Sequence, residues 1–189
     1  MLKSLLVVSS FLFFVTSLVA QDNLIKNGHF AEGTKNWNVL LLDKSQPIKA
    51  HIEHADSYKE YGLADNFVGT NFVELDQKSA IEQTILTRKG ESYTLLFAYA
   101  HRPNAGTKQL IVTAGNRAIY TKTIKNTEAA GNFTYKHVTF IATENETKIG
   151  FHSVSILGGA EDMGILLTDV LCNFTSEVDL DRFVSDKKF

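Results

Sequence analysis

The chain has 189 residues, 44% of them hydrophobic and 21% charged, with only 2 Pro and 12 Gly. This composition is typical of a globular domain and excludes an intrinsically disordered chain and a collagen-like repeat. The formal net charge of −2 does not suit binding to nucleic acid, which selects basic proteins. The single cysteine, Cys172, excludes an intramolecular disulfide framework and a cysteine zinc cluster. We therefore expect one domain that is stabilised by packing.

The first 20 residues have the pattern of an export signal. A basic start, Met1–Lys3, precedes the uncharged apolar run Leu5–Ala20, which is shorter than the roughly 20 apolar residues that a spanning helix needs. We predict a signal peptide over residues 1–20, cleaved after Ala20 or after Ser17. The expected product is a secreted, extracellular protein with no membrane span, and an uncleaved anchor is the alternative.

From residue 23 to residue 175, short segments rich in Val, Ile, Phe, Tyr and Thr alternate with Gly, Asn and Asp, which is typical of a β-sandwich or barrel. We predict an all-β domain over residues 21–175. The charged segment 176–189 lacks this pattern, so it is predicted to be a flexible tail or, alternatively, an amphipathic partner-binding segment. The predicted strands are Leu24–Lys26, Trp37–Leu42, Lys49–His54, Asn71–Asp76, Ala80–Thr87, Ser92–His101, Lys108–Ala114, Arg117–Ile124, Thr134–Ala142, Lys148–Val154 and Gly164–Phe174.

Three segments predict local structure in more detail. Gly115 and Asn116 separate two β-rich runs and tolerate positive φ, so Lys108–Ile124 is predicted to be a hairpin. The segment Ser92–Ala100 is apolar on both faces, which predicts a strand covered on both sides. The polar segment Asp56–Asp65 is predicted to be either a turn of helix or a loop.

Export would determine whether three sequons are glycosylated and whether one thiol can be oxidised. Asn132, Asn145 and Asn173 each begin an Asn-x-Thr sequon and are predicted glycan acceptors in a eukaryotic secreted protein. Cys172 alternates with apolar residues in the last predicted strand. It is expected either to be buried as a small hydrophobe or to form an intermolecular disulfide.

Four segments resemble, in family order, the galactose-binding-like jelly-roll domains. They are NLIKNGHFAEGTKNW from Asn23, NFVELDQKSAIEQTILT from Asn71, GESYTLLFAYAHRP from Gly90 and GILLTDVLC from Gly164. Such domains occur in secreted carbohydrate-binding modules and in the repeats of plant cell-wall galactose-binding-like proteins. The resemblance implies an antiparallel jelly-roll β-sandwich that binds carbohydrate. It implies no particular sugar, because one fold supports many sites.

Aromatic side chains are the first candidate ligand contacts. Trp37, the only tryptophan, either offers its face to a sugar ring or fills the core. Tyr58 and Tyr61 lie in a polar segment, where we expect them to be accessible to a ligand.

Polar candidates cluster in two predicted loops. Arg102 lies in the RP motif of the resemblance, followed by Asn104, and the intervening proline keeps Arg102 extended at the end of its strand. The guanidinium either binds sugar hydroxyls or a uronic carboxylate, or pairs internally with Asp76. Glu161 and Asp162 lie among glycines, where they either accept sugar hydroxyls or form a solvated turn.

The resemblance also implies a structural Ca²⁺ between the opening loop and the last strand. The matching oxygen ligands are Asn27, Glu32 and Asp169, which suit a hard cation. The match is imperfect because Ala31 stands where the family has Glu and Glu32 follows one residue later. A shift by one residue reverses side-chain direction in a strand, although a loop can absorb it.

The sequence contains no recognised catalytic motif. It has no G-x-S-x-G, no H-E-x-x-H and no phosphate-binding glycine loop. We predict a monomeric, non-catalytic module that binds cell-wall or extracellular polysaccharide. The alternative is an extracellular adhesion or matrix protein that binds another protein through the sandwich, which a large exposed apolar patch would indicate.

Overall fold

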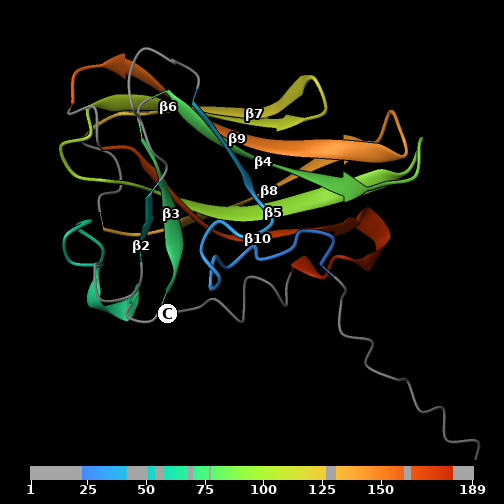
Figure 1. The fold of residues 1–189 in the computed structure, drawn as a ribbon, viewed down its shortest axis with the longest axis horizontal. Coiled ribbons are helices and arrows are strands. Elements are labelled where there is room, and N and C mark those ends of the chain that lie inside the picture. The colour runs from blue at the N-terminus through green and yellow to red at the C-terminus, as the bar shows by residue number, and fades with distance from the viewer. Residues whose placement is uncertain are drawn as a thin grey trace, which may run out of the picture.

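The computed structural model describes residues 23–41, 51–53, 58–67, 70–76, 78–126, 131–159 and 163–180. Within them two five-stranded antiparallel sheets stack face to face (Figure 1), which confirms the predicted sandwich. Sheet A has the order β1 (Asn38–Leu41), β4 (Ser79–Leu86), β9 (Glu146–Leu157), β6 (Thr107–Ala114) and β7 (Arg117–Ile124). Sheet B has the order β2 (His51–Glu53), β3 (Phe72–Leu75), β10 (Ile165–Phe174), β5 (Ser92–His101) and β8 (Thr134–Ile141).

The main core lies between the sheets because alternate residues of each strand point to the same face. In β5 these residues are Tyr93, Leu95, Phe97 and Tyr99, all of them buried. The Phe97 ring meets Phe151 of sheet A edge to face, with ring centroids 5.3 Å apart. Each such side chain contributes about 1.5–3 kcal/mol when it is fully buried.

A second apolar cluster covers the outer face of sheet B. It forms where residues 58–67 fold back over β3, β5 and β10, and it includes the edge-to-face pair Phe67 and Phe133. These residues form turns and a 3₁₀ turn, Asp65–Phe67, so the described part of the predicted helix or loop is a loop. β5 is therefore buried on both faces, as predicted. The cluster members are Tyr61, Leu63, Phe67, Phe72, Ala98, Ala100, Phe133 and Leu166.

The predicted strand Leu24–Lys26 is wrong: this segment consists of bends and turns. Side chains take the place of a strand ladder. Asn23 accepts the Cys172 N–H at 2.9 Å, and the Gln83 amide accepts the Lys26 N–H at 2.7 Å and donates to its carbonyl at 2.9 Å. Because side-chain amides satisfy these backbone groups, the segment packs against both sheets without joining either one.

β6 and β7 form the predicted hairpin, with Gly115 at φ 60° in its turn. β6 also carries a lysine on its core-facing side. Lys108 alternates with Leu110 and Val112 and is fully buried, and its Nζ has no hydrogen-bond partner among the described residues. Burial lowers the pKa of Lys108, while the negative charges of Asp76 and Glu74 act in the opposite direction.

β7 and β8 are the last strands of their sheets, lie on the same side of the sandwich and contact each other. Side chains paired with core residues point into the space between the sheets. Tyr120 of β7 lies opposite Val112, and Lys136 of β8 lies opposite Phe97. We call this side of the molecule, formed by Arg117–Ile124 and Thr134–Ile141, the open edge.

The predicted signal peptide, residues 1–20, lies outside the described residues, as does the tail beyond Leu180. Among the residues that the structure describes, none belongs to a helix with the length and apolarity needed to cross a membrane.

Candidate functional site

Arg102 has an internal partner, but it is not the predicted one. Its Nη1 donates to both carboxylate oxygens of Glu74, at 2.9 and 3.2 Å, and not to Asp76. Glu74 is 1% exposed and also accepts the Gly164 N–H at 2.8 Å. Glu74 and Arg102 both lie on the outer face of sheet B, on the side of Phe72, Ala98 and Ala100. The two residues therefore join three segments of the fold.

The RP motif also anchors the covering loop. The Arg102 guanidinium lies 4.3 Å from the ring centroid of Tyr61, which is 6% exposed. A Cβ on Gly62 would lie 2.4 Å from Pro103, so the backbone can approach this closely only at a glycine with φ 69°. The prediction that Tyr61 is accessible to a ligand is wrong, since its ring fills the second cluster under Arg102.

Trp37 belongs to the core. It is 7% exposed and packs between Phe30, at 5.5 Å between ring centroids, and Phe151, at 6.2 Å. Its indole N–H donates to the Asn27 carbonyl at 3.1 Å. Aromatic rings cover Trp37 on these sides, and its only donor is engaged. The prediction that Trp37 contacts a sugar is therefore wrong, and the alternative prediction that it fills the core is confirmed.

The remaining predicted ligand contacts are Tyr58, Asn104, Glu161 and Asp162. Tyr58 is half-buried, and its hydroxyl donates to Asp65 at 2.9 Å. Asn104 is exposed in the turn between β5 and β6, with φ 66°. Glu161 and Asp162 lie outside the described residues. The role of these four residues in ligand binding therefore stays a prediction.

The predicted calcium ligands are engaged with protein donors. Asn27 Oδ1 accepts the Glu32 N–H at 3.1 Å, and the Glu32 carboxylate pairs with Lys35. Asp169, which is 7% exposed, accepts from His29 Nδ1 at 2.6 Å and from the Tyr135 hydroxyl at 3.1 Å. A cation would need oxygens that face it without donors in between. This arrangement therefore does not fit a bound Ca²⁺, and we derive no role for one.

The Asp169 contacts are part of the architecture of β10. Asp169 lies in the bulge between Thr168 and Leu171 and has φ 51°. Burial raises the pKa of Tyr135, and the charge and the hydrogen bond of Asp169 act in the same direction. The hydroxyl therefore stays protonated and holds one carboxylate oxygen, while His29 holds the other.

The predicted glycan acceptors differ in exposure. Asn132 and Asn145 are exposed. Asn173 is 3% exposed, and its Oδ1 accepts the Phe174 N–H at 2.7 Å. A glycan has no space at this position in the folded domain, so the prediction for Asn173 conflicts with the structure. Cys172 is a buried free thiol whose pKa burial raises to about 12, which favours the buried hydrophobe over the intermolecular disulfide.

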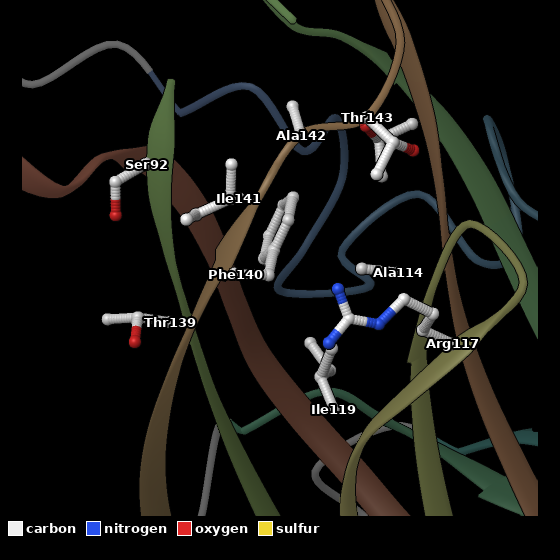
Figure 2. A pocket seen from close by; sticks show the side chains of 10 residues that line it. Ser92, Ala114, Arg117, Ile119, Thr139, Phe140, Ile141, Ala142 and Thr143 are labelled. Carbon is white, nitrogen blue, oxygen red and sulfur yellow. The ribbon is translucent and has the colours of Figure 1, made fainter. Parts of the chain in front are cut away.

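A cleft of about 380 Å³ opens between the two strands of the open edge. In Figure 2 the Arg117 side chain reaches from the start of β7 toward the Phe140 ring of β8, with Ile119 beside the guanidinium. Thr143 stands at the far rim, and Thr139 lies on the other side of the β8 ribbon. The guanidinium has no hydrogen-bond or ionic partner among the described residues. The cleft therefore combines an apolar floor with one available cationic fork.

The open edge continues away from this cleft. The Tyr120 hydroxyl lies 3.2 Å from that of Tyr99, and Lys136 Nζ lies 5.7 Å from the centroid of the Tyr120 ring. Beyond them is a second, smaller cleft of about 180 Å³, whose lining includes Lys122 and Asn132. We call this stretch, from the Arg117 cleft past Tyr120 and Lys136 to Lys122, the edge groove.

Among the residues that the structure describes, none of those proposed from sequence motifs lines the Arg117 cleft. The cleft forms where β7 and β8 approach each other, and only the stacking of the two sheets brings these strands together. One signal was available, because Lys136 alternates with Val138 and Phe140. A lysine on the apolar face of a strand indicates that this strand lies at an edge.

The chain matches one family model and resembles a known plant protein. The family model described as "Protein of unknown function (DUF642)" matches residues 23–165. The Arabidopsis thaliana protein DUF642 L-GALACTONO-1,4-LACTONE-RESPONSIVE GENE 2 is 25% identical over 163 residues, covering 79% of this chain and 44% of that protein. The chain thus spans less than half the length of this curated relative.

Two solved structures share the fold at low identity. TmCBM61 in complex with β-1,4-galactotriose is 14% identical with a TM-score of 0.53, covering 81% of this chain and 99% of that one. The Stig cyclase Fisc from Fischerella sp. TAU is 18% identical with a TM-score of 0.52, covering 79% and 95%. Because the family model extends from the opening segment to the first residue of β10, the chain belongs to the DUF642 family.

Proposed function

We propose that this domain is a secreted, non-catalytic carbohydrate-binding module whose ligand lies in the edge groove. The observation that carries the proposal is the Arg117 cleft, where a guanidinium that pairs with no described residue lies beside the apolar floor of Phe140 and Ile119. Sugar rings present C–H faces and hydroxyl edges, and a surface with an apolar floor and a few polar groups can contact both. The two clefts of the edge groove lie along the same pair of edge strands, which suits a chain-like ligand.

The solved structures support this proposal without deciding it. TmCBM61 is a galactotriose complex on the same fold, whereas Fisc is a cyclase on that fold. Fold alone therefore does not select the function. Within the part of the chain that the structure describes, the lining of the Arg117 cleft includes no Asp, Glu, His or Cys. A glycoside hydrolase needs two carboxyl groups across the bond that it cleaves, so this cleft favours binding over hydrolysis.

The test starts from the full chain expressed in a eukaryotic host. Intact mass of protein recovered from the medium shows whether residues 1–20 are removed and whether Asn132 and Asn145 carry glycans, which endoglycosidase then trims. The trimmed protein is screened on a glycan array and in polysaccharide pull-downs. We expect selective binding to one polysaccharide class. Folded protein that binds no glycan would contradict the proposal and favour the protein-binding alternative.

A further inference from the structure

We propose that the ligand of the edge groove is an anionic polysaccharide, with its carboxylate or sulfate groups bound by Arg117 and Lys136. This inference rests on the proposed function and adds the chemical class of the ligand. It follows from where the charges lie in the fold, since the chain as a whole is slightly acidic.

The two strands of the open edge carry only positive charges. The β7 sequence RAIYTKTI contains Arg117 and Lys122, the β8 sequence TYKHVTFI contains Lys136, and neither contains Asp or Glu. The described residues that line the two clefts likewise include no carboxylate. Because the whole chain has 21 acidic and 19 basic residues, this local excess is opposite in sign to the net charge.

Arg117 and Lys136 both project from the core-facing sides of their strands rather than from the outer faces. Arg117 lies opposite Ala114, which packs against the core, and Lys136 lies opposite Phe97. Residues that face each other across an antiparallel pair share one face of the sheet. Both side chains therefore start on the core-facing sides of their strands and reach solvent through the gap between them. Both are exposed.

Arg117 has the geometry for an oxyanion ligand. Its guanidinium offers a planar fork of donors that matches a carboxylate or a sulfate in paired hydrogen bonds. Arg102 Nη1 donates to Glu74, whereas Arg117 has no carboxylate partner among the described residues. The adjacent Phe140 and Ile119 exclude water from one side of the guanidinium, which strengthens its attraction for an anion.

The second cation lies farther along the groove. Lys136 Nζ lies above the Tyr120 ring, and the Tyr120 hydroxyl is within hydrogen-bond distance of the Tyr99 hydroxyl. Arg117 and Tyr120 are three residues apart on β7, a span of roughly 10 Å in an extended strand. Two cations separated along a groove, with a tyrosine between them, suit a ligand whose negative charges repeat along a chain.

Cations on edge strands have a simpler explanation, because inward-pointing lysines prevent strands from pairing with other molecules. That role needs no ligand, and it predicts that neutralising Arg117 or Lys136 promotes self-association and changes no binding. The experiment therefore measures both properties on the same variants.

Binding is measured by calorimetry with alginate, a uronan, and with dextran sulfate, each beside its neutral counterpart: methyl-esterified alginate and dextran. β-1,4-Galactan serves as a neutral test of the proposed function itself. We expect at least one anionic polymer to bind, its neutral counterpart not to bind, and the affinity to fall as salt rises from about 0.05 to 0.5 M. The two anionic polymers distinguish carboxylate from sulfate as the bound group.

The variants are Arg117→Gln, Lys136→Gln and, as the matched control, Lys26→Gln, which removes an exposed cation from the side where Gln83 of β4 lies. We expect Arg117→Gln to weaken anionic binding about 10-fold or more and Lys136→Gln to weaken it less. Lys26→Gln should leave it unchanged. Circular dichroism and light scattering confirm that each variant is folded and report its association state.

Each failure has a distinct meaning. Binding to galactan with none to either anionic polymer would overturn this inference and leave the proposed function intact. Binding to no polymer would overturn both. Anionic binding that Arg117→Gln and Lys136→Gln leave unchanged would overturn the groove as the site. Self-association of these variants with unchanged binding would assign the two cations to edge protection.

Discussion

The motif-bearing part of the sandwich and its open edge use polar side chains in opposite ways. In the motif-bearing part, polar side chains hold the fold together: Gln83 binds both backbone groups of Lys26, and Glu74 binds Arg102 and the Gly164 N–H. At the open edge, Arg117 has no such partner in the described parts of the chain. The difference teaches that the residues carrying the family resemblance are used for architecture. The candidate ligand contacts are residues that no motif includes.

The largest expected effect is on the stability of the motif-bearing part. Glu74→Ala should lower the free energy of unfolding by about 3–5 kcal/mol, because it leaves the Arg102 charge and the Gly164 N–H without their buried acceptor. Urea denaturation measures the loss. The matched control is Glu32→Ala, which removes an exposed ion pair with Lys35 and should cost less than about 1 kcal/mol. Equal losses in the two variants would refute the architectural role of Glu74.

Lys108 allows the effect of a buried cation on stability to be compared with that of an exposed one. Lys108→Met should raise the free energy of unfolding at neutral pH by about 1–3 kcal/mol, because the Nζ has no hydrogen-bond partner in the described interior. Since burial lowers the pKa of Lys108, the folded state disfavours its charged form. The loss of folding stability that this lysine causes is therefore greatest at low pH.

The gain from Lys108→Met should therefore shrink as pH rises toward 10.5, the ordinary lysine pKa. Chemical denaturation at pH 7 and pH 10 checks this trend. Lys136→Met, at the open edge, is the control and should show no such pH dependence. A Lys108→Met variant that is less stable than the parent at pH 7 would contradict the interpretation.

The buried thiol predicts a smaller, pH-dependent difference. Burial raises the pKa of Cys172 to about 12 from 9.0, so the folded state holds the neutral thiol while the unfolded state ionises above pH 9. The thiol's contribution to stability is fully present below pH 9 and is lost as pH rises toward 12. Relative to Cys172→Ala, the parent should lose about 1.4 kcal/mol per pH unit above pH 9.

Denaturation of the parent and of Cys172→Ala between pH 8 and pH 11 measures this difference, because the other titrating groups are common to both chains. A difference that does not vary with pH would show that the thiol is accessible to solvent. Slow reaction of the folded parent with a thiol reagent provides an independent check.

Arg117→Gln should change stability very little, within about 0.5 kcal/mol, since the side chain is exposed and has no internal partner in the described structure. Thermal and urea unfolding of the variant test this expectation. A loss comparable to that of Glu74→Ala would remove the distinction between the two regions, because it would make Arg117 part of the architecture.

Calcium gives the smallest expected effect. Adding Ca²⁺ or a chelator should leave the unfolding temperature unchanged, because His29, Tyr135 and the Glu32 N–H occupy the oxygens that a cation would need. A calcium-dependent rise in the unfolding temperature would show that Asp169 exchanges these donors for a metal. Asp169→Asn would then abolish the rise.

The sequence predicted the architecture well because local signals carry it. Gly115 marked the hairpin turn, and the apolar residues of β5 marked a strand covered on both faces. Strand alternation does not distinguish the partner of Arg102, because Glu74 and Asp76 both have the parity of Phe72. Only the folded structure shows that the guanidinium binds Glu74.

Other features depend on contacts between distant segments. Leu24–Lys26 has a strand-like composition, but the Gln83 amide occupies its backbone groups from 57 residues away. Trp37 and Tyr61 became core residues because Phe151 and Arg102 cover them. The Arg117 cleft has two walls that belong to different sheets, so no single segment predicts it, and the only local signal is the edge lysine Lys136 of β8.

The burial of β5 on both faces separates the motions of the domain into two classes. Its backbone amides are shielded from solvent by the main core on one side and by the 58–67 loop on the other. In hydrogen exchange they should report only the unfolding of the whole domain, whereas the amides of β7 and β8 should exchange through local opening of the edge. A ligand in the edge groove would slow the second class of amides far more than the first.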